Sequence, residues 1–204
     1  LCLDEYEHLQ HTLDAGWGLA FLDTLRHVLQ HRPRMVLMFT GAHTFAELGP
    51  AWTDRFISVR RVRVSFLTRE AVLTLLTQPI PAFDLTYAPD APDVLYLASH
   101  GQPLLSQAVA FELVQHLNEQ QRREATPADV ETALTRALSS GGEYFANVWS
   151  DAGVAGQAIL HAVAWGKTPP DDPLAYAWLR EHDVLNDAGA FAVPLVQRWV
   201  REQR

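Results

Sequence analysis

Two short apolar runs on either side of a helical pattern constrain how the first third of this chain can fold. The runs are Leu1–Leu3 and MVLMFTG, Met35–Gly41. Between them, leucines from Leu19 to Leu29 recur at spacings of three and four residues, as on one face of a helix. A strand, a helix and a second all-apolar strand predict a βαβ unit with a parallel sheet, so residues 1–66 are expected to form an α/β domain.

The remainder of the chain carries helical signals. In residues 67–139, Thr68 is a helix N-cap, His100-Gly101 breaks a helical pattern, and Pro103 stands near the next helix start. These features predict an all-helical lid subdomain. In residues 140–204, three helical stretches are followed by the turn sequence NDAG and a closing helix, PLVQRWVREQR. Because NDAG lies between two short apolar runs, the order predicts a winged helix-turn-helix.

Composition narrows the class of protein. The 16 basic and 24 acidic residues give a net charge of −8, which argues against non-specific nucleic-acid binding, although VRRVRV forms a local basic cluster. The longest apolar runs are shorter than the roughly 18–20 residues that cross a bilayer, so no membrane association is expected. The one cysteine, Cys2, cannot form an internal disulfide, and a cytoplasmic location is the default expectation.

Polar residues with catalytic potential follow both apolar runs. Asp4 and Glu5 come directly after the first run, and Thr40 ends the second. Parallel α/β sheets bind ligands at the carboxyl ends of their strands. In phosphoryl transfer an aspartate there holds magnesium, a glutamate activates water, and a hydroxyl contacts the γ-phosphate. The alternative is that these are the ordinary polar residues met where any strand leaves a core.

At these residues the chain resembles a known family. LCLDEYEHL is similar to the Walker B strand, and MVLMFTGAHTFAEL to the sensor-1 strand, of AAA+-type P-loop ATPases. The strongest resemblance is to the prokaryotic STAND class of signal-transduction ATPases. That class adds a helical lid with a Gly-x-Pro motif, here GQP at 101–103, and a winged helix ending in a phrase similar to FAVPLVQRWV at 191–200.

The resemblance implies a fold and a set of roles. The fold class would be a partial α/β P-loop NTPase core, an all-α lid and a C-terminal winged helix. ATP or ADP with Mg²⁺ would be the cofactors. Asp4 would position the metal, Glu5 would act as general base, and Thr40 would sense the γ-phosphate.

Two further sets of residues carry implied roles. Gly101, Gln102 and Pro103 would pack against adenine, although a helix break needs the same residues. Arg55 would reach a phosphate of a neighbouring subunit, and a surface arginine is the alternative interpretation. His8 and His11 are interpreted as surface or packing histidines, because no third metal ligand stands at a fixed spacing.

One element of the family pattern is missing. The phosphate-binding motif GxxxxGK(S/T) does not occur in the sequence, and the one lysine, Lys167, stands far from Asp4. Leu1 is therefore expected to be an internal residue of a longer protein. The chain would be the rear half of a switch ATPase, inactive alone, with the P-loop half, sensor or effector domains and further subunits as partners.

Two alternatives stay open. The chain could be a winged-helix regulator with a non-catalytic scaffold, for which DNA binding is disfavoured because the third helix, PLAYAWLREH, and the residues after it hold more acid than base. It could also be an interaction module whose Walker B residues are relics.

Overall fold

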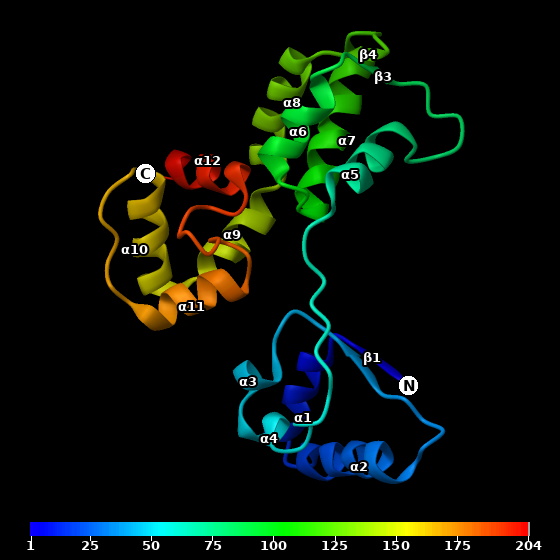
Figure 1. The fold of residues 1–204 in the computed structure, drawn as a ribbon, viewed down its shortest axis with the longest axis vertical. Helices are drawn as coiled ribbons and strands as arrows, with labels where there is room; N and C mark the ends of the chain where they lie inside the picture. Colours follow the sequence, from blue (N-terminus) through cyan, green and yellow to red (C-terminus); the bar gives the residue numbers. More distant parts are fainter. Residues whose placement is uncertain (204) are drawn as a thin grey trace. The chain divides into compact units, whose positions relative to one another are not determined.

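The computed structural model describes residues 1–203 and divides into two compact units. The N-terminal unit is Leu1–Arg63 and the C-terminal unit is Val64–Arg204 (Figure 1). The sequence analysis placed domain boundaries after residues 66 and 139. In the structure the chain passes from one unit to the other between Arg63 and Val64, and residues on both sides of 139 belong to the same unit.

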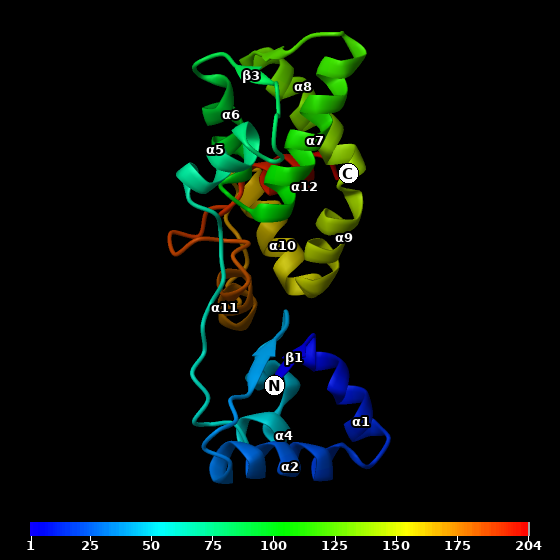
Figure 2. The same cartoon turned by 90° about the vertical axis from the view of Figure 1, so that its right-hand side faces the viewer.

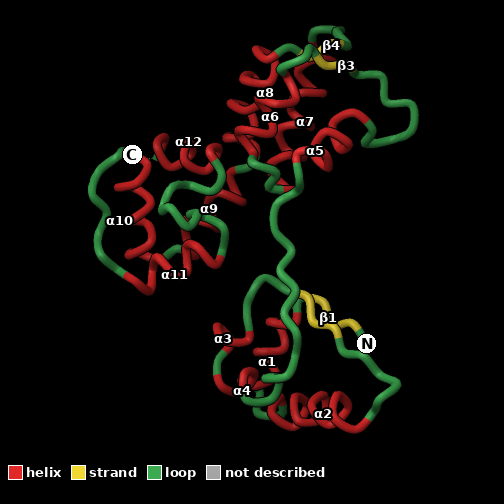
Figure 3. Tube along the Cα trace, in the orientation of Figure 1, coloured by secondary structure: helices red, strands yellow, loops and turns green. Residues whose placement is uncertain are grey.

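The N-terminal unit combines short helices with a two-stranded parallel sheet. Strand β1 pairs with β2 in a register that sets Cys2 opposite Met38 and Asp4 opposite Thr40. Three helices lie between the two strands in the sequence, and α2 is the longest of them (Figure 3). The elements in chain order are β1 Cys2–Asp4, the 3₁₀ helix η1 Tyr6–Leu9, α1 Gln10–Asp14, α2 Gly18–His31, β2 Met38–Thr40, α3 Phe45–Leu48 and α4 Pro50–Thr53.

Aromatic rings form most of the core of the N-terminal unit. Trp52 is fully buried and Phe56 is nearly so. The Phe45 and Trp52 rings stack with centroids 5.6 Å apart, and Tyr6 meets Trp52 edge-on at 5.2 Å. From α2, Leu22 is among the residues that join this cluster. Of the periodic leucines in the sequence, Leu22 and Leu25 lie on the buried face of α2, whereas Leu19 is 51% exposed.

The C-terminal unit is a helical assembly in which α7 packs along α8 and α6 packs against α8 (Figure 2). Helix α10 packs against α12. One continuous core of leucine, valine and alanine receives side chains from all of these helices. The elements are α5 Arg69–Thr77, β3 Thr86–Tyr87, α6 Ala91–Ser99, α7 Pro103–Glu119, β4 Glu124–Ala125, α8 Pro127–Ser140, α9 Gly142–Asp151, α10 Gly153–Ala164, α11 Pro173–Glu181 and α12 Pro194–Glu202.

The helices of this unit begin where the sequence supplies caps. The Thr68 side chain accepts a hydrogen bond from the Ala71 N–H at the start of α5. Thr126 forms a capping box with Asp129 at the start of α8, where Pro127 occupies the first turn. The Asp172 side chain accepts a hydrogen bond from the Ala175 N–H at the start of α11. Side-chain acceptors satisfy N–H groups that would otherwise lack a partner, so these starts are well defined.

The predicted fold class, an α/β P-loop core followed by a winged helix, is wrong. Helices hold 59% of the residues, and the strands of residues 1–203 form two parallel pairs, β1–β2 and β3–β4. The predicted second strand begins only at Met38, since Met35–Leu37 lack regular structure. Leu3 and Phe39 pack onto the core, whereas Met38 is 57% exposed, so this sheet is covered on one face. A parallel α/β core requires both faces to be covered.

The segment predicted to form the wing does not form a two-stranded hairpin. Leu185 and Phe191 form a single isolated antiparallel bridge. Both side chains are buried, as are Val184 and Val193, so the segment packs into the helical core. Apolar side chains on both flanks of the turn explain this, because burying them stabilises more than a projecting ribbon would. The DNA-binding alternative depended on the same winged helix.

Among residues 1–203, none of the helices combines the length and the apolar character that a bilayer crossing requires.

Candidate functional site

The carboxyl ends of β1 and β2 bring the first predicted residues together. Parallel pairing sets Asp4 beside Thr40. The Thr40 hydroxyl donates a hydrogen bond to Asp4 Oδ1, and the Glu5 backbone N–H lies 3.2 Å from the same oxygen. Both hydrogen bonds fall on Oδ1. Asp4 and Thr40 therefore form one polar site at the sheet edge, although 35 residues separate them in the sequence.

Glu5 adopts an unusual backbone conformation next to this pair. Its φ of 49° and ψ of 48° lie in the left-handed region, which costs a residue with a Cβ roughly 1–2 kcal/mol. The side chain is 69% exposed, and its Oε2 lies 2.9 Å from His8 Nε2. Strained residues of this kind concentrate at functional sites, which motivates a functional hypothesis for Glu5.

The next two residues attach η1 to the segment after β2. The Tyr6 hydroxyl donates to the His43 carbonyl, and burial raises the pKa of Tyr6 to about 12. The Ala42 N–H donates to Glu7 Oε1 over 2.9 Å. Burial alone would raise the pKa of Glu7, but the hydrogen bonds from Ala42 and His43 outweigh it and lower that pKa. These contacts hold the two strand ends side by side.

Glu7 also explains the glycine that follows Thr40. A Cβ at Gly41 would collide with the Glu7 carboxylate, so a side chain here would displace the carboxylate or the strand end. The sequence analysis did not identify Glu7. Its position two residues after Glu5 offered no signal, because the contact with Ala42 depends on the strand pairing.

The donor set at the sheet edge fits one type of metal binding. Among the described residues 1–203, no three His, Cys, Asp or Glu side chains are grouped to hold a metal ion. Mg²⁺ commonly binds through one or two carboxylates, with water and substrate phosphates completing its octahedron. The exposed Asp4 carboxylate, whose two hydrogen bonds fall on Oδ1, is compatible with that mode. A closed cage made only of protein ligands is not.

Arg55 lies after α4 and contacts groups of its own unit. Its Nε is 2.7 Å from Asp23 Oδ1, and its second amino group is 3.3 Å from Oδ2, a paired geometry that suits a guanidinium. Arg55 also donates to the Ala51 carbonyl. The side chain is only 18% exposed. The structure thus gives Arg55 a role in joining α2 to α4.

The predicted Gly-Gln-Pro motif forms the turn between α6 and α7. Gly101 has a φ of 75°, and its carbonyl accepts a 2.7 Å hydrogen bond from the Leu67 N–H. A Cβ at Gly101 would collide with the Leu67 carbonyl. Gln102 caps α7 by accepting from the Leu105 N–H over 2.7 Å, and Pro103 begins the helix. The turn therefore fixes the chain entering the unit against the start of α7.

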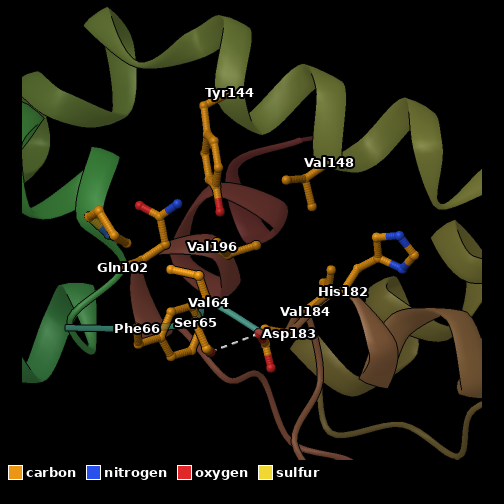
Figure 4. Close-up of a pocket in the computed structure, with 11 residues that line it drawn as sticks. Val64, Ser65, Phe66, Gln102, Tyr144, Val148, His182, Asp183, Val184 and Val196 are labelled. Atoms are coloured by element: carbon orange, nitrogen blue, oxygen red, sulfur yellow. Dashed lines mark hydrogen bonds between the residues drawn. The ribbon is translucent and has the colours of Figure 1, made fainter. Parts of the chain in front are cut away.

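Gln102 and Pro103 also line a cavity of about 260 Å³ within the C-terminal unit (Figure 4). Ser65 donates a 2.9 Å hydrogen bond to Asp183 Oδ2 at its edge. Burial, together with the charge of Asp183, raises the pKa of the Tyr144 hydroxyl to about 12. The lining residues are Val64, Ser65, Phe66, Gln102, Pro103, Tyr144, Val148, His182, Asp183, Val184 and Val196.

Sequence reasoning found only part of this cavity. The Gly-Gln-Pro motif was recognised, whereas Tyr144, His182 and Asp183 were assigned to the winged helix and given no part in a site. They come from two separate places in the chain, α9 and the residues after α11, and only the packing of these segments brings them together. Asp183 has a φ of 55°, a turn conformation that aspartate tolerates better than most residues.

Comparison with protein-family models, with curated proteins and with solved structures finds no match to this chain.

Proposed function

We propose that this chain is the rear part of an ATP-binding and ATP-hydrolysing regulatory switch, similar to STAND-class ATPases. The observation that supports it most is the polar site at the ends of β1 and β2. There Asp4 and Thr40 are hydrogen-bonded across parallel strands, and the strained, exposed Glu5 follows directly. A carboxylate, a hydroxyl and a second carboxylate at one sheet edge are among the groups that phosphoryl transfer to water needs.

In this proposal each residue has a separate task. Asp4 would hold Mg²⁺, which supplies neutralisation of phosphate charge when bound. Glu5 orients the attacking water and accepts its proton. Thr40 would turn its hydroxyl from Asp4 to donate a hydrogen bond to the γ-phosphate, and Arg55 would leave Asp23 to reach a phosphate of a neighbouring subunit. A segment with the phosphate-binding motif, absent from this sequence, must be supplied by another part of the protein.

The adenine is proposed to pack against the turn formed by Gly101, Gln102 and Pro103. The cavity beside this turn supports the proposal, because it combines apolar walls such as Val148 with the Tyr144 hydroxyl. Small-molecule sites typically combine apolar walls with a few polar groups that fix orientation. The output domain and the partner subunits follow only from the resemblance, and the cytoplasmic location only from the single cysteine.

The test compares two variants of the protein expressed from its complete reading frame. Glu5→Gln preserves the side-chain volume and removes the charge. We expect hydrolysis to fall at least about 100-fold while ATP affinity stays within about twofold, because the base acts only in the chemical step. Glu143→Gln, an exposed glutamate at the start of α9, is the matched control and should change neither quantity.

Other outcomes would contradict the proposal. Full activity in Glu5→Gln removes the general-base assignment. Absence of ATP binding by the complete protein refutes the nucleotide role altogether. The 204-residue chain alone is expected to show no magnesium-dependent ATP turnover, since the phosphate-binding motif does not occur in it.

The nucleotide position has its own test. Val148→Trp fills the cavity from α9 and should weaken ATP binding at least tenfold if adenine packs there. Val154→Trp places the same ring on α10 at a residue that is 86% exposed, and should leave affinity unchanged. Equal affinity in both variants would place the base elsewhere.

A further inference from the structure

Two histidines share one face of α2 at its C-terminal end. His27 and His31 are four residues apart, and their ring centroids lie 4.5 Å apart at an interplanar angle of 43°. Both side chains are exposed. Residues at this spacing are neighbours on a helix surface, so the two imidazoles lie within reach of one common point in solvent.

That geometry matches the requirements of a transition-metal ion. Imidazole nitrogens bind Zn²⁺ at about 2.0–2.1 Å, so two such ligands in tetrahedral geometry lie about 3.3 Å apart. Rings with centroids 4.5 Å apart reach this separation by rotating about their side-chain torsions, which exposure leaves unhindered. Histidines four apart on one helix face are a known zinc-ligand arrangement.

The local charges both favour and oppose a cation. Helix C-termini carry partial negative charge from unpaired carbonyls, and both histidines lie in the last two turns of α2. Arg26 and Arg32 flank the pair and oppose binding. Asp23, one turn before His27, is held by Arg55 and is therefore not counted as a ligand.

We propose that His27 and His31 form an exchangeable site for a borderline-soft divalent metal such as Cu²⁺, Ni²⁺ or Zn²⁺. Two protein ligands leave the other positions to water, consistent with the finding that no three candidate ligands are grouped in residues 1–203. Imidazole nitrogens do not suit Mg²⁺, so this site is chemically distinct from the one proposed at Asp4. A bound ion would join consecutive turns of α2.

The chain contains a matched control pair. His8 and His11 are three residues apart, and their ring centroids are 6.2 Å apart. His8 Nε2 already lies 2.9 Å from Glu5 Oε2. Because this pair is wider and partly engaged, it is expected to bind the same ions more weakly.

The experiment titrates the untagged 204-residue chain with Cu²⁺, Ni²⁺ and Zn²⁺ by calorimetry. A Cys2→Ser background removes the exposed thiol as a competing ligand. We expect one site, tightest for Cu²⁺, and no binding of Mg²⁺ at the same concentrations. Either His27→Gln or His31→Gln should weaken Cu²⁺ binding at least tenfold, because a single remaining imidazole cannot chelate the ion. His8→Gln should change it less than about twofold.

A local readout identifies where the ion sits. Paramagnetic Cu²⁺ added below one equivalent should first broaden the backbone amide signals around His27 and His31. Broadening that begins near His8 would overturn the proposal. It would also fail if Cu²⁺ affinity were unchanged in His27→Gln and His31→Gln. Unchanged far-ultraviolet circular dichroism establishes that α2 stays folded in each variant.

Discussion

The two units of the chain use different means to build a core. In the N-terminal unit few side chains are buried, and the aromatic contacts around Trp52 hold the short elements together. Met38 in its sheet and Val36 before that strand remain exposed. In the C-terminal unit every helix from α5 to α12 contributes aliphatic side chains to one continuous core.

This difference indicates where the stability of the chain lies. A domain of about 60 residues buries a smaller fraction of its surface than one of about 140, so its margin is narrower. When a few aromatic rings supply most of the burial, the loss of any one of them is a large fraction of the total. We therefore expect the N-terminal unit to unfold first, and the following substitutions test that expectation in order of decreasing effect.

The largest effect is expected from Trp52→Ala. Trp52 is fully buried, stacks on Phe45, and donates its indole N–H to Gln10 over 3.1 Å. Truncation of a buried aromatic residue costs roughly 3–5 kcal/mol, enough to unfold the N-terminal unit alone. Its amide signals should collapse into the unfolded range in nuclear magnetic resonance spectra, while those of the C-terminal unit stay dispersed.

Leu113→Ala is the counterpart in the C-terminal unit. Leu113 on α7 is also fully buried, and the substitution costs roughly 2–5 kcal/mol. Here we expect a lower urea midpoint and a unit that stays folded in water. Unfolding of both units by Trp52→Ala, or retention of a folded N-terminal unit, would show that the two cores are not energetically distinct.

Gly101→Ala should be the next most damaging change. The φ of 75° and the adjacent Leu67 carbonyl both oppose a Cβ at this position. The backbone penalty and the clash together predict a loss of roughly 2–4 kcal/mol in the C-terminal unit by urea unfolding. Gly142→Ala is the control, since a Cβ there meets no atom within 4 Å and should change stability by less than about 0.5 kcal/mol. Equal losses in the two variants would contradict the clash.

Asp129 connects stability of the C-terminal unit to pH. Burial alone would raise its pKa, but hydrogen bonds from Arg122 and Thr126 outweigh burial and hold the pKa far below the usual range. The folded pKa is lower than the unfolded value of about 3.9, so this contribution is complete at neutral pH. It is lost as pH falls below about 4 toward the folded pKa.

Asp129→Asn should remove most of that contribution. We expect a loss of roughly 1.5–3 kcal/mol at pH 7, because charge-assisted hydrogen bonds to Arg122 disappear. The variant should also show a flatter stability profile between about pH 4 and 2 in urea titrations. The exposed Asp187→Asn is the control and should retain the wild-type profile. A wild-type profile in Asp129→Asn would assign the acid sensitivity to other carboxylates.

The smallest expected effect is a gain. Glu5→Gly relieves the left-handed conformation and should stabilise the N-terminal unit by roughly 0.5–1 kcal/mol, measured as a raised urea midpoint. The same variant should lack ATP hydrolysis in the complete protein if the proposed function holds. A loss of stability would mean that the contact of Glu5 with His8 outweighs the backbone strain.

Helix positions were largely predictable from the sequence, and the physical reason is local. Thr68 caps the helix start at which the sequence pattern placed it, Pro103 begins α7, and His100-Gly101 ends α6 as expected. Capping and proline preferences depend on neighbouring residues in the chain, so they do not require knowledge of the tertiary structure.

The lengths of the strands could not be predicted, because they depend on contacts between distant parts of the chain. Leu1–Leu3 and Met35–Gly41 have the composition of strands buried on both faces, yet each pairs over only three residues. Strand length depends on what pairs and covers it, which no local pattern records. The same limit applies to the candidate site. Asp4, Glu5 and Thr40 follow from strand order, whereas Glu7 and Tyr144 became visible only through packing.

The hydrogen bond from Leu67 to Gly101 has a consequence for how the chain tolerates added length. It fixes the first residues of the C-terminal unit against the start of α7, whereas Val62, before the boundary, is 75% exposed and lies outside regular structure. A flexible insert costs little where neither core depends on chain spacing. Extra residues placed after Arg61 should therefore leave both cores intact. The same insert after Leu67 would lengthen the chain between the Leu67–Gly101 hydrogen bond and the Thr68 cap of α5, and should destabilise the C-terminal unit.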